Sequence, residues 1–180
     1  MVYVLLAEGF EEVEALTPVD LLRRAGVETR LVGVTGATVC GARGINVVTD
    51  LSMDEVDLAK ADMLVLPGGM PGTTNLAACE KLTEALKKAD QEKRGIAAIC
   101  AAPSVLGDLG FLKGKKAVCY PGFESRLTGV EVLAVPVVTD GHITTSRGMG
   151  TAIAFALELT KRLKDEETAK QVSRSILYNV

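Results

Sequence analysis

Ile96-Ala97-Ala98-Ile99-Cys100-Ala101-Ala102-Pro103 is a stretch in which a strand passes almost directly into a helix. The short apolar run that ends at Ile99 predicts a buried strand over Gly95–Ile99. Pro103 suits the first turn of a helix, where its missing N–H costs nothing, so a helix is expected over Pro103–Leu109. The side chain of Cys100 would then sit on a sharp turn and point out of the edge of the sheet, as in a nucleophile elbow.

Strand-like and helix-like segments alternate on both sides of this turn. Strands are expected over Val2–Ala7, Thr29–Val34, Asp62–Pro67, Ala117–Tyr120, Glu131–Val138 and His142–Ser146, and a hairpin over 38–50. Helices are expected over Glu11–Ala25, Glu80–Glu92, Met149–Leu163 and Glu166–Ser175. This alternation predicts one α/β domain over 1–180, with a largely parallel sheet covered by helices on both faces.

Composition narrows the class of protein. The chain has 180 residues, 48% of them apolar, and a net charge of −3. No basic stripe with interleaved aromatic residues indicates a nucleic-acid partner, and no apolar run is long enough for a membrane span. Met1–Gly9 lacks the basic start of a signal peptide, so a soluble, cytoplasmic protein is expected. Four dispersed cysteines and one histidine predict free thiols rather than disulfides or a zinc site.

In a parallel sheet the reactive groups gather at the carboxyl ends of the strands, and Cys100 follows one such end. We expect the free amides and the dipole at the start of the following helix to lower the pKa of Cys100 and favour the thiolate. The alternative is a small buried hydrophobic residue that only closes the strand. Cys40, Cys79 and Cys119 lie in less informative positions, and a structural role is favoured for each.

A cysteine that works as a nucleophile needs an acid or base beside it. The one histidine, His142, follows the hairpin turn Asp140-Gly141 and is interpreted as a solvated turn residue, so a carboxyl partner is expected. Three glutamates follow the first strand, and spacing alone does not choose among Glu11, Glu12 and Glu14. Glu14 lies beside apolar positions of the expected helix, where burial would raise its pKa and keep it protonated.

Gly68-Gly69 follows another apolar strand and belongs to neither a Walker motif nor a GxGxxG fingerprint. If that strand neighbours the one ending at Ile99, the amide of Gly69 could face the sulfur. Together with the amide of Ala101 it would then form an oxyanion hole.

Several motifs, in order along the whole chain, make it resemble the DJ-one branch of the ThiJ/PfpI superfamily. They are Ala7-Glu8-Gly9-Phe10-Glu11-Glu12-Val13-Glu14, Pro18-Val19-Asp20 with Arg23-Arg24-Ala25-Gly26, Val65-Leu66-Pro67-Gly68-Gly69, Ile96–Pro103, and Thr145-Ser146-Arg147-Gly148 with Gly150-Thr151. The resemblance implies a flavodoxin-like three-layer sandwich, usually a homodimer. It also implies that the reactive cysteine is Cys100 and its partner glutamate Glu14.

The resemblance further implies amide donors at Gly69 and Ala101 and a pocket that includes Gly68, Tyr120 and Arg147. Members of the branch are described as glyoxalases that need no cofactor and convert methylglyoxal or glyoxal to the hydroxy acid without glutathione, and as deglycases that reverse early aldehyde adducts. Small reactive aldehydes or glycated molecules are therefore the expected partners, and no cofactor or metal is expected.

Two other activities follow from the same resemblance. An oxidative-stress sensor or chaperone-like protein would work through oxidation of Cys100. A peptidase or amidase is less favoured, because Ala101 replaces the histidine that follows the cysteine in PfpI-type peptidases. A second departure is Tyr120-Pro121, where the member that gives the branch its name has a histidine before a proline.

Overall fold

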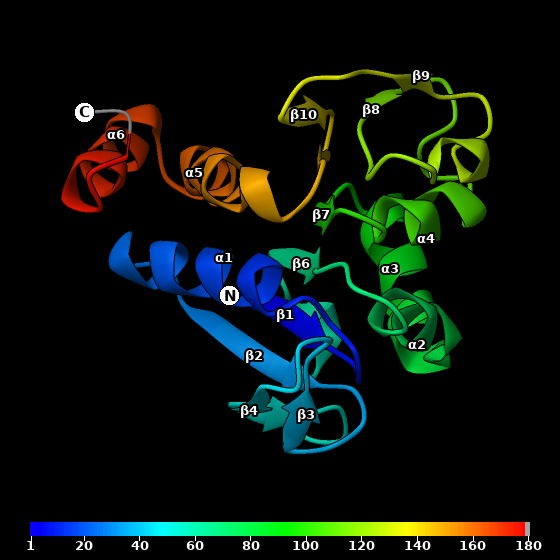
Figure 1. Ribbon diagram of the computed structural model, residues 1–180, viewed down its shortest axis with the longest axis horizontal. Coiled ribbons are helices and arrows are strands. Elements are labelled where there is room, and N and C mark those ends of the chain that lie inside the picture. The colour runs from blue at the N-terminus through cyan, green and yellow to red at the C-terminus, as the bar shows by residue number, and fades with distance from the viewer. Residues whose placement is uncertain (179–180) are drawn as a thin grey trace.

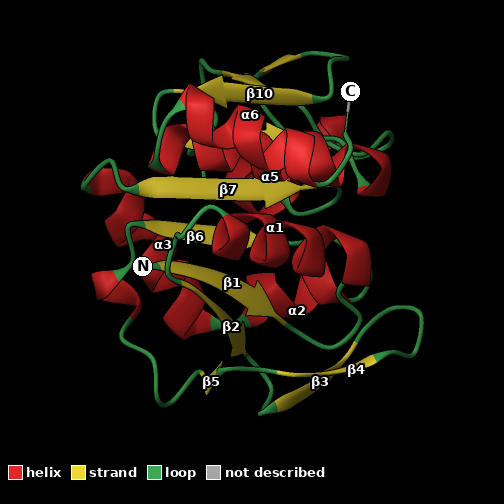
Figure 2. Ribbon diagram, turned by 90° about the vertical axis from the view of Figure 1, so that its left-hand side faces the viewer, coloured by secondary structure: helices red, strands yellow, loops and turns green. Residues whose placement is uncertain are grey.

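A central sheet organises the computed structural model, which describes residues 1–178. Its strand order is β10-β11-β7-β6-β1-β2-β5, with every neighbouring pair parallel except β10 and β11 (Figure 2). The strands are β1 (Val2–Leu6), β2 (Thr29–Gly33), β5 (Leu51–Ser52), β6 (Met63–Leu66), β7 (Gly95–Ile99), β10 (Val137–Asp140) and β11 (Ile143–Ser146). The predicted hairpin turn at Asp140-Gly141 joins β10 to β11 and is confirmed.

Helices cover both faces of this sheet (Figure 1). One face carries α1 (Glu12–Arg24) and α5 (Ala152–Leu163), with α6 (Glu166–Ser175) packed on them. The other face carries α2 (Gly72–Ala78), α3 (Glu80–Gln91) and α4 (Pro103–Asp108). The prediction of a flavodoxin-like three-layer α/β sandwich is therefore confirmed. Residues 179 and 180, which the predicted domain 1–180 included, lie outside the described residues.

The apolar runs of the sequence become strands because both faces of the sheet are buried. Val4, Val65 and Ile99 pack against α1 and α5. Leu5 and Ala98, which point to the opposite face, pack with the core beneath α3 and α4. Along the central strands β1, β6 and β7, side chains alternate between the two cores, and almost none is accessible to solvent.

Smaller elements account for most differences from the expected boundaries. A hairpin of β3 (Thr38–Cys40) and β4 (Asn46–Val48) lies beside the main sheet as predicted, and β8 (Lys116–Ala117) pairs with β9 (Glu131–Val132). Short 3-10 helices span Leu58–Lys60, Glu124–Arg126 and Met149–Thr151. The strand predicted over Glu131–Val138 is split into β9 and β10, and Pro136, which has no N–H to offer a strand partner, lies between the two.

The topology fixes where a binding site is expected. β1 lies in the middle of the sheet, with β2 on one side and β6 on the other, so the chain reverses its direction of winding between β1 and β6. Sites in such sheets lie beyond the carboxyl ends of the strands at this switch point. The segments that follow β1, β6 and β7 there contain Glu14, Gly68-Gly69 and Cys100.

Among residues 1–178, no helix combines the length and the apolar character that crossing a bilayer would require.

Candidate active site

Cys100 occupies a sharp turn between β7 and α4, as predicted. Its φ of +67° lies in the left-handed region, which side chains other than glycine rarely adopt. The backbone on both sides is anchored: the amide of Cys100 donates to the carbonyl of Ser146 at 3.0 Å, and its carbonyl accepts from the amide of Tyr120 at 2.7 Å. A conformation of this kind costs on the order of 1–3 kcal/mol and persists because the surrounding structure enforces it. The fold thus holds the sulfur in one direction.

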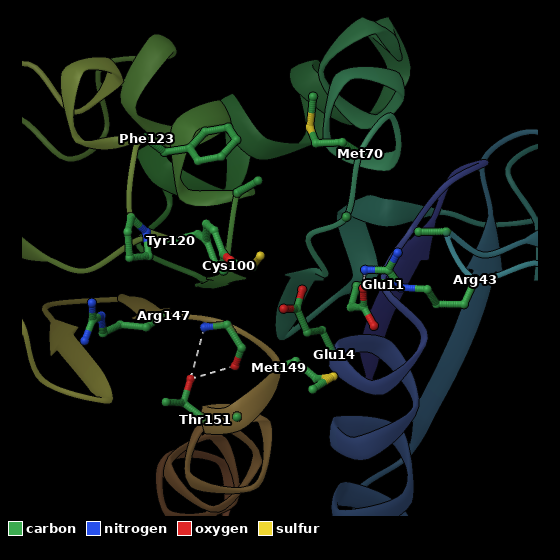
Figure 3. A pocket seen from close by; sticks show the side chains of 16 residues that line it. Glu11, Glu14, Arg43, Met70, Cys100, Tyr120, Phe123, Arg147, Met149 and Thr151 are labelled. Carbon is green, nitrogen blue, oxygen red and sulfur yellow. Dashed lines mark hydrogen bonds and ion pairs between the residues drawn. The ribbon is translucent and has the colours of Figure 1, made fainter.

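Glu14 is the glutamate that the structure brings to this sulfur. It lies near the start of α1, where Pro18 lacks the N–H that would bond to the Glu14 carbonyl, and the residue is only 1% exposed. Its Oε2 accepts a hydrogen bond from the amide of Gly68 at 3.0 Å. The carboxyl group is also hydrogen-bonded to Cys100 and to the backbone of Met149. Figure 3 shows the carboxyl group and the sulfur at the same pocket.

The two other glutamates that spacing left open are engaged elsewhere. Glu12 is buried, and its Oε1 accepts from the amide of Arg43 at 2.8 Å. Glu11 lies at the pocket wall, with its Oε2 3.8 Å from Nη2 of Arg43. Both therefore hold the turn of the β3–β4 hairpin against the start of α1.

Gly68 separates the two reactive groups and leaves no room for a side chain. A Cβ at this position would lie 2.5 Å from the Cβ of Cys100 and 2.6 Å from Oε2 of Glu14. Gly68 is therefore a spacer in contact with both groups rather than part of the pocket wall, which begins at Gly69. Gly69 has a φ of +89°, and a Cβ there would lie 2.4 Å from the amide nitrogen of Glu11. The glycine pair is thus required by close packing.

The two predicted amide donors reach the sulfur. The backbone N–H groups of Gly69 and Ala101 both hydrogen-bond to Cys100 and favour its ionised form. They come from two neighbouring strand ends, β6 and β7, as expected if the two strands are adjacent. The site therefore has paired donors next to the sulfur.

Burial dominates the protonation of both acids. It raises the pKa of Glu14 from an ordinary value of 4.5 to about 7. Burial first, and then the charge of ionised Glu14, raise the pKa of Cys100 from 9.0 to about 12, against the opposing effect of the Gly69 and Ala101 amides. The expectation that the turn lowers the pKa of Cys100 is therefore wrong, because removal from water outweighs two amides.

The two groups titrate as a pair. The pair loses its first proton near pH 7 and its second only near pH 12. Between these values one proton is shared by the carboxyl group and the thiol, so that one of them is anionic while the other donates a hydrogen bond to it.

A pocket of about 630 Å³ opens beside the pair. Tyr120 and Arg147 line it, as predicted from the family resemblance. Thr151, from the quoted motif Gly150-Thr151, lines it too. Other lining side chains carried no signal that a single sequence reveals, because loops far apart in the chain bring them together; these are Ala42, Arg43, Met70, Phe123 and Met149. Thr151 accepts a hydrogen bond from the amide of Gly148 at 3.1 Å and so holds the loop on one side of the pocket.

The remaining candidates lie away from this pocket. His142 is buried, and its Nε2 lies 2.8 Å from Oδ1 of Asp90, so the expectation of a solvated turn residue is wrong. Cys40 and Cys79 are partly buried, and Cys119 is buried in the core beneath α4, where burial raises its pKa to about 11. In the described part of the chain, no group of three or more His, Cys, Asp or Glu side chains is arranged to hold a metal ion.

Comparisons with known proteins agree with this fold. The model of the DJ-1/PfpI family matches residues 1–162. The chain is 39% identical to Protein DJ-1 homolog A of Arabidopsis thaliana over 98% of its own length, but spans only 46% of that relative. It is 35% identical to a protein named a deglycase in Pyrococcus horikoshii, covering 91% of this chain and 99% of the relative.

Among solved structures, that of oxidized DJ-1 from Toxoplasma gondii has a TM-score of 0.95 and 37% identity, and the match covers 99% of this chain and 98% of the other. Fold, motifs and family model therefore lead to one conclusion: the chain belongs to the DJ-1/PfpI family.

Proposed function

We propose that this protein is a cofactor-independent enzyme of the glyoxalase and deglycase type, which acts on methylglyoxal and related 2-oxoaldehydes or their adducts. The observation that supports it best is the hydrogen-bonded pair of Glu14 and Cys100 beside a pocket of about 630 Å³. Relatives named as deglycases support enzyme activity in the family.

The productive state, in this proposal, is the one in which the shared proton lies on Glu14 and the sulfur is anionic. Protonation removes the negative charge of Glu14, which otherwise raises the pKa of Cys100, and turns the carboxyl group into a hydrogen-bond donor to the thiolate. The Gly69 and Ala101 amides stabilise the same state. A pKa of Glu14 near 7 is well suited to proton transfer at neutral pH.

The chemistry then needs no external oxidant. The thiolate adds to the aldehyde carbon, and the resulting hemithioacetal oxyanion is stabilised by the amides of Gly69 and Ala101. Glu14 first gives its proton to this oxyanion. As a carboxylate it then removes the proton from the same carbon and returns it to the neighbouring ketone carbon, while the hydroxyl proton of the first carbon passes to the oxygen of the second. The first carbon is thereby oxidised and the second reduced. The product is a thioester of Cys100, and water hydrolyses it to the 2-hydroxy acid and the free thiol.

A turnover assay with methylglyoxal in the absence of glutathione tests this function. Cys100→Ser is expected to abolish product formation, and Glu14→Gln to lower kcat about 10²- to 10⁴-fold, the usual contribution of a general acid–base. Equal activity in wild type and both variants would end the proposal.

The protonation state has its own test, the pH dependence of Cys100 alkylation by iodoacetamide. A fraction that reacts as thiolate near pH 7–8, and that grows as the first proton leaves the pair, is the expected result. A sulfur that reacts only above pH 9 would place the shared proton on sulfur and contradict the proposed productive state.

A second function, sensing of oxidative stress with or without chaperone-like activity, is favoured by one observation. A protonated Glu14 and two amides could all donate hydrogen bonds to a sulfinate on Cys100. After mild peroxide treatment, mass spectrometry should find Cys100 oxidised well before Cys79 and Cys119. Equal oxidation of the three cysteines would remove this alternative.

The expected homodimer stays a prediction. Val13 and Leu16 on α1 are 42% and 37% exposed, which is unusual for two apolar side chains on one helix and is what a partner subunit would cover. Sedimentation analysis of the wild type and of Val13→Asp tests it. A monomeric wild type would contradict the expectation.

A further inference from the structure

A smaller cavity of about 90 Å³ adjoins the pocket, and no step of the proposed reaction takes place in it. It lies between α2 and the segment that follows α4, and its wall consists of Met70, Thr73, Thr74, Ala77, Val105 and Arg126. Met70 lines both this cavity and the main pocket. The two spaces therefore meet at one side chain.

The cavity contains a hydroxyl group that lacks a hydrogen-bond partner in the described residues. Thr73 is 3% exposed, and its Oγ1 makes no hydrogen bond with the described residues. A buried polar atom of this kind costs on the order of 1–3 kcal/mol, so a ligand group that satisfies it is favoured over an apolar one. Thr73 thus favours a hydroxylated ligand in this cavity.

The side chain of Met70 has room to adopt other rotamers. It is 52% exposed, which leaves room for other rotamers, and a methionine side chain is unbranched and flexible. Figure 3 shows Met70 next to α2, whereas Met149 lies on the opposite side of the pocket, near Glu14. Met149 is similarly exposed, at 55%, but it lines the main pocket and not the small cavity.

The size of the cavity limits what can enter. About 90 Å³ corresponds to roughly three water molecules at the density of the liquid. A short hydroxylated carbon chain of a few heavy atoms fits this space, whereas methylglyoxal does not need it.

We propose that Met70 determines substrate length and that the cavity behind it accepts the hydroxylated tail of a sugar-derived 2-oxoaldehyde, with Thr73 as its hydrogen-bond partner. This inference rests on the proposed function and names its substrate class. The aldehyde end stays at Cys100, and the tail displaces the Met70 side chain towards solvent.

Three substrates separate the length effect from the hydroxyl effect: methylglyoxal, 2-oxohexanal, and the 4,5,6-trihydroxy derivative of 2-oxohexanal. Met70→Ala opens the passage and is expected to raise kcat/KM for both six-carbon substrates relative to methylglyoxal by about ten-fold. The matched variant Met149→Ala, which removes the same side chain from the other wall, should not change this ratio. Equal effects of the two variants would overturn the assignment of Met70.

Thr73→Val, made in the wild type and in Met70→Ala, tests the hydroxyl. It keeps the shape of the side chain and should lower kcat/KM for the trihydroxy substrate relative to 2-oxohexanal by about three- to ten-fold, the value of one lost hydrogen bond. No change in this ratio would overturn the role of Thr73.

A readout that needs no turnover separates this inference from the proposed function. Alkylation of Cys100 by N-hexyl iodoacetamide, relative to iodoacetamide, should be faster in Met70→Ala and unchanged in Met149→Ala. If alkylation responds in this way while no variant converts any aldehyde, the cavity assignment stands and the glyoxalase function fails. If aldehydes are converted but neither ratio responds to Met70, the cavity assignment fails alone.

Discussion

β7 and β11 run side by side, and each end of this strand pair carries a pair of titratable groups of which one, Glu14 or His142, is buried. At the carboxyl end, Cys100 follows β7 and is hydrogen-bonded to Glu14. At the amino end, His142 precedes β11, and its ring lies 2.8 Å from the carboxyl group of Asp90. The two pairs share burial and a strand, but only the first lines the large pocket.

The difference lies in the chemistry of the partners. His142 and Asp90 are a base and an acid, so transfer of a proton between them leaves opposite charges that attract each other. Glu14 and Cys100 are two acids, and ionisation of one opposes ionisation of the other. Burial therefore holds a proton at the carboxyl end of the sheet up to about pH 7, where it is available for transfer. A buried pair indicates a reactive site when its members compete for a proton next to a pocket.

The largest effect expected from this comparison is on the pH dependence of stability. The pKa of Glu14 is raised to about 7 in the folded protein, above its unfolded value, so the folded state binds this proton more tightly. The resulting contribution is fully present below about pH 4.5 and is lost as the pH rises through 7. Between pH 4.5 and pH 8 the wild type should lose about 3 kcal/mol relative to Glu14→Gln, which cannot titrate.

Urea denaturation of both proteins at several pH values measures this difference. A difference in unfolding free energy that stays constant with pH would mean that Glu14 titrates normally. The window excludes the second proton of the pair, which leaves only near pH 12.

The next largest effect is expected from a change in the spacing between Glu14 and Cys100. Gly68→Ala places a methyl group 2.5 Å from the Cβ of Cys100 and 2.6 Å from Oε2 of Glu14, so the two groups must move apart. A displacement of about 1 Å at a reacting centre costs on the order of 10²-fold in rate, and kcat/KM for methylglyoxal should fall by this amount. Gly150→Ala is a matched control for stability, because a Cβ there meets no atom within 4 Å. Wild-type turnover by Gly68→Ala would show that the close contact is not needed.

The comparison also predicts a pH–rate profile. If the singly protonated pair is the active form, kcat/KM should fall about ten-fold per pH unit below pH 7, where Glu14 and Cys100 both hold protons. In Glu14→Gln the thiol of Cys100 is the one member of the pair that still ionises, so the limb at pH 7 should be replaced by one that follows the titration of the thiol. A wild-type profile that is flat between pH 5 and pH 8 would mean that the protonation state of the pair does not affect kcat/KM.

Particular residues show how far sequence reasoning reaches. The strand over Gly95–Ile99, the turn at Cys100 and the helix starting at Pro103 were predictable, because a buried apolar run and a proline at a helix start leave few conformations. Spacing alone could not choose Glu14 over Glu11 and Glu12, since all three lie at the start of one helix. What distinguishes them is their contacts with Gly68, in the loop after β6, and with Arg43, in the turn between β3 and β4.

Burial explains the two misjudged side chains. The pKa of Cys100 was expected to fall because local sequence reveals the helix start but not how much water the surrounding loops exclude. His142 was expected in solvent because its turn motif is polar, whereas α3 places Asp90 against it. The small cavity beside Met70 was also missed, because residues from the loop after β6, from α2 and from the segment around Arg126 form it together.

The smallest effect concerns the amino-end pair, which should contribute to stability alone. Asp90→Asn keeps the size of the side chain and removes its charge, so the contact with His142 is weakened but no cavity is left. The free energy of unfolding should fall by about 1 kcal/mol, the net value of one hydrogen bond, while kcat/KM for methylglyoxal stays within about two-fold of wild type. Urea denaturation and the turnover assay measure both quantities on one preparation. Loss of turnover at full stability would mean that both ends of β7 and β11 act on the reaction, and would remove the contrast between an acid–acid and an acid–base pair.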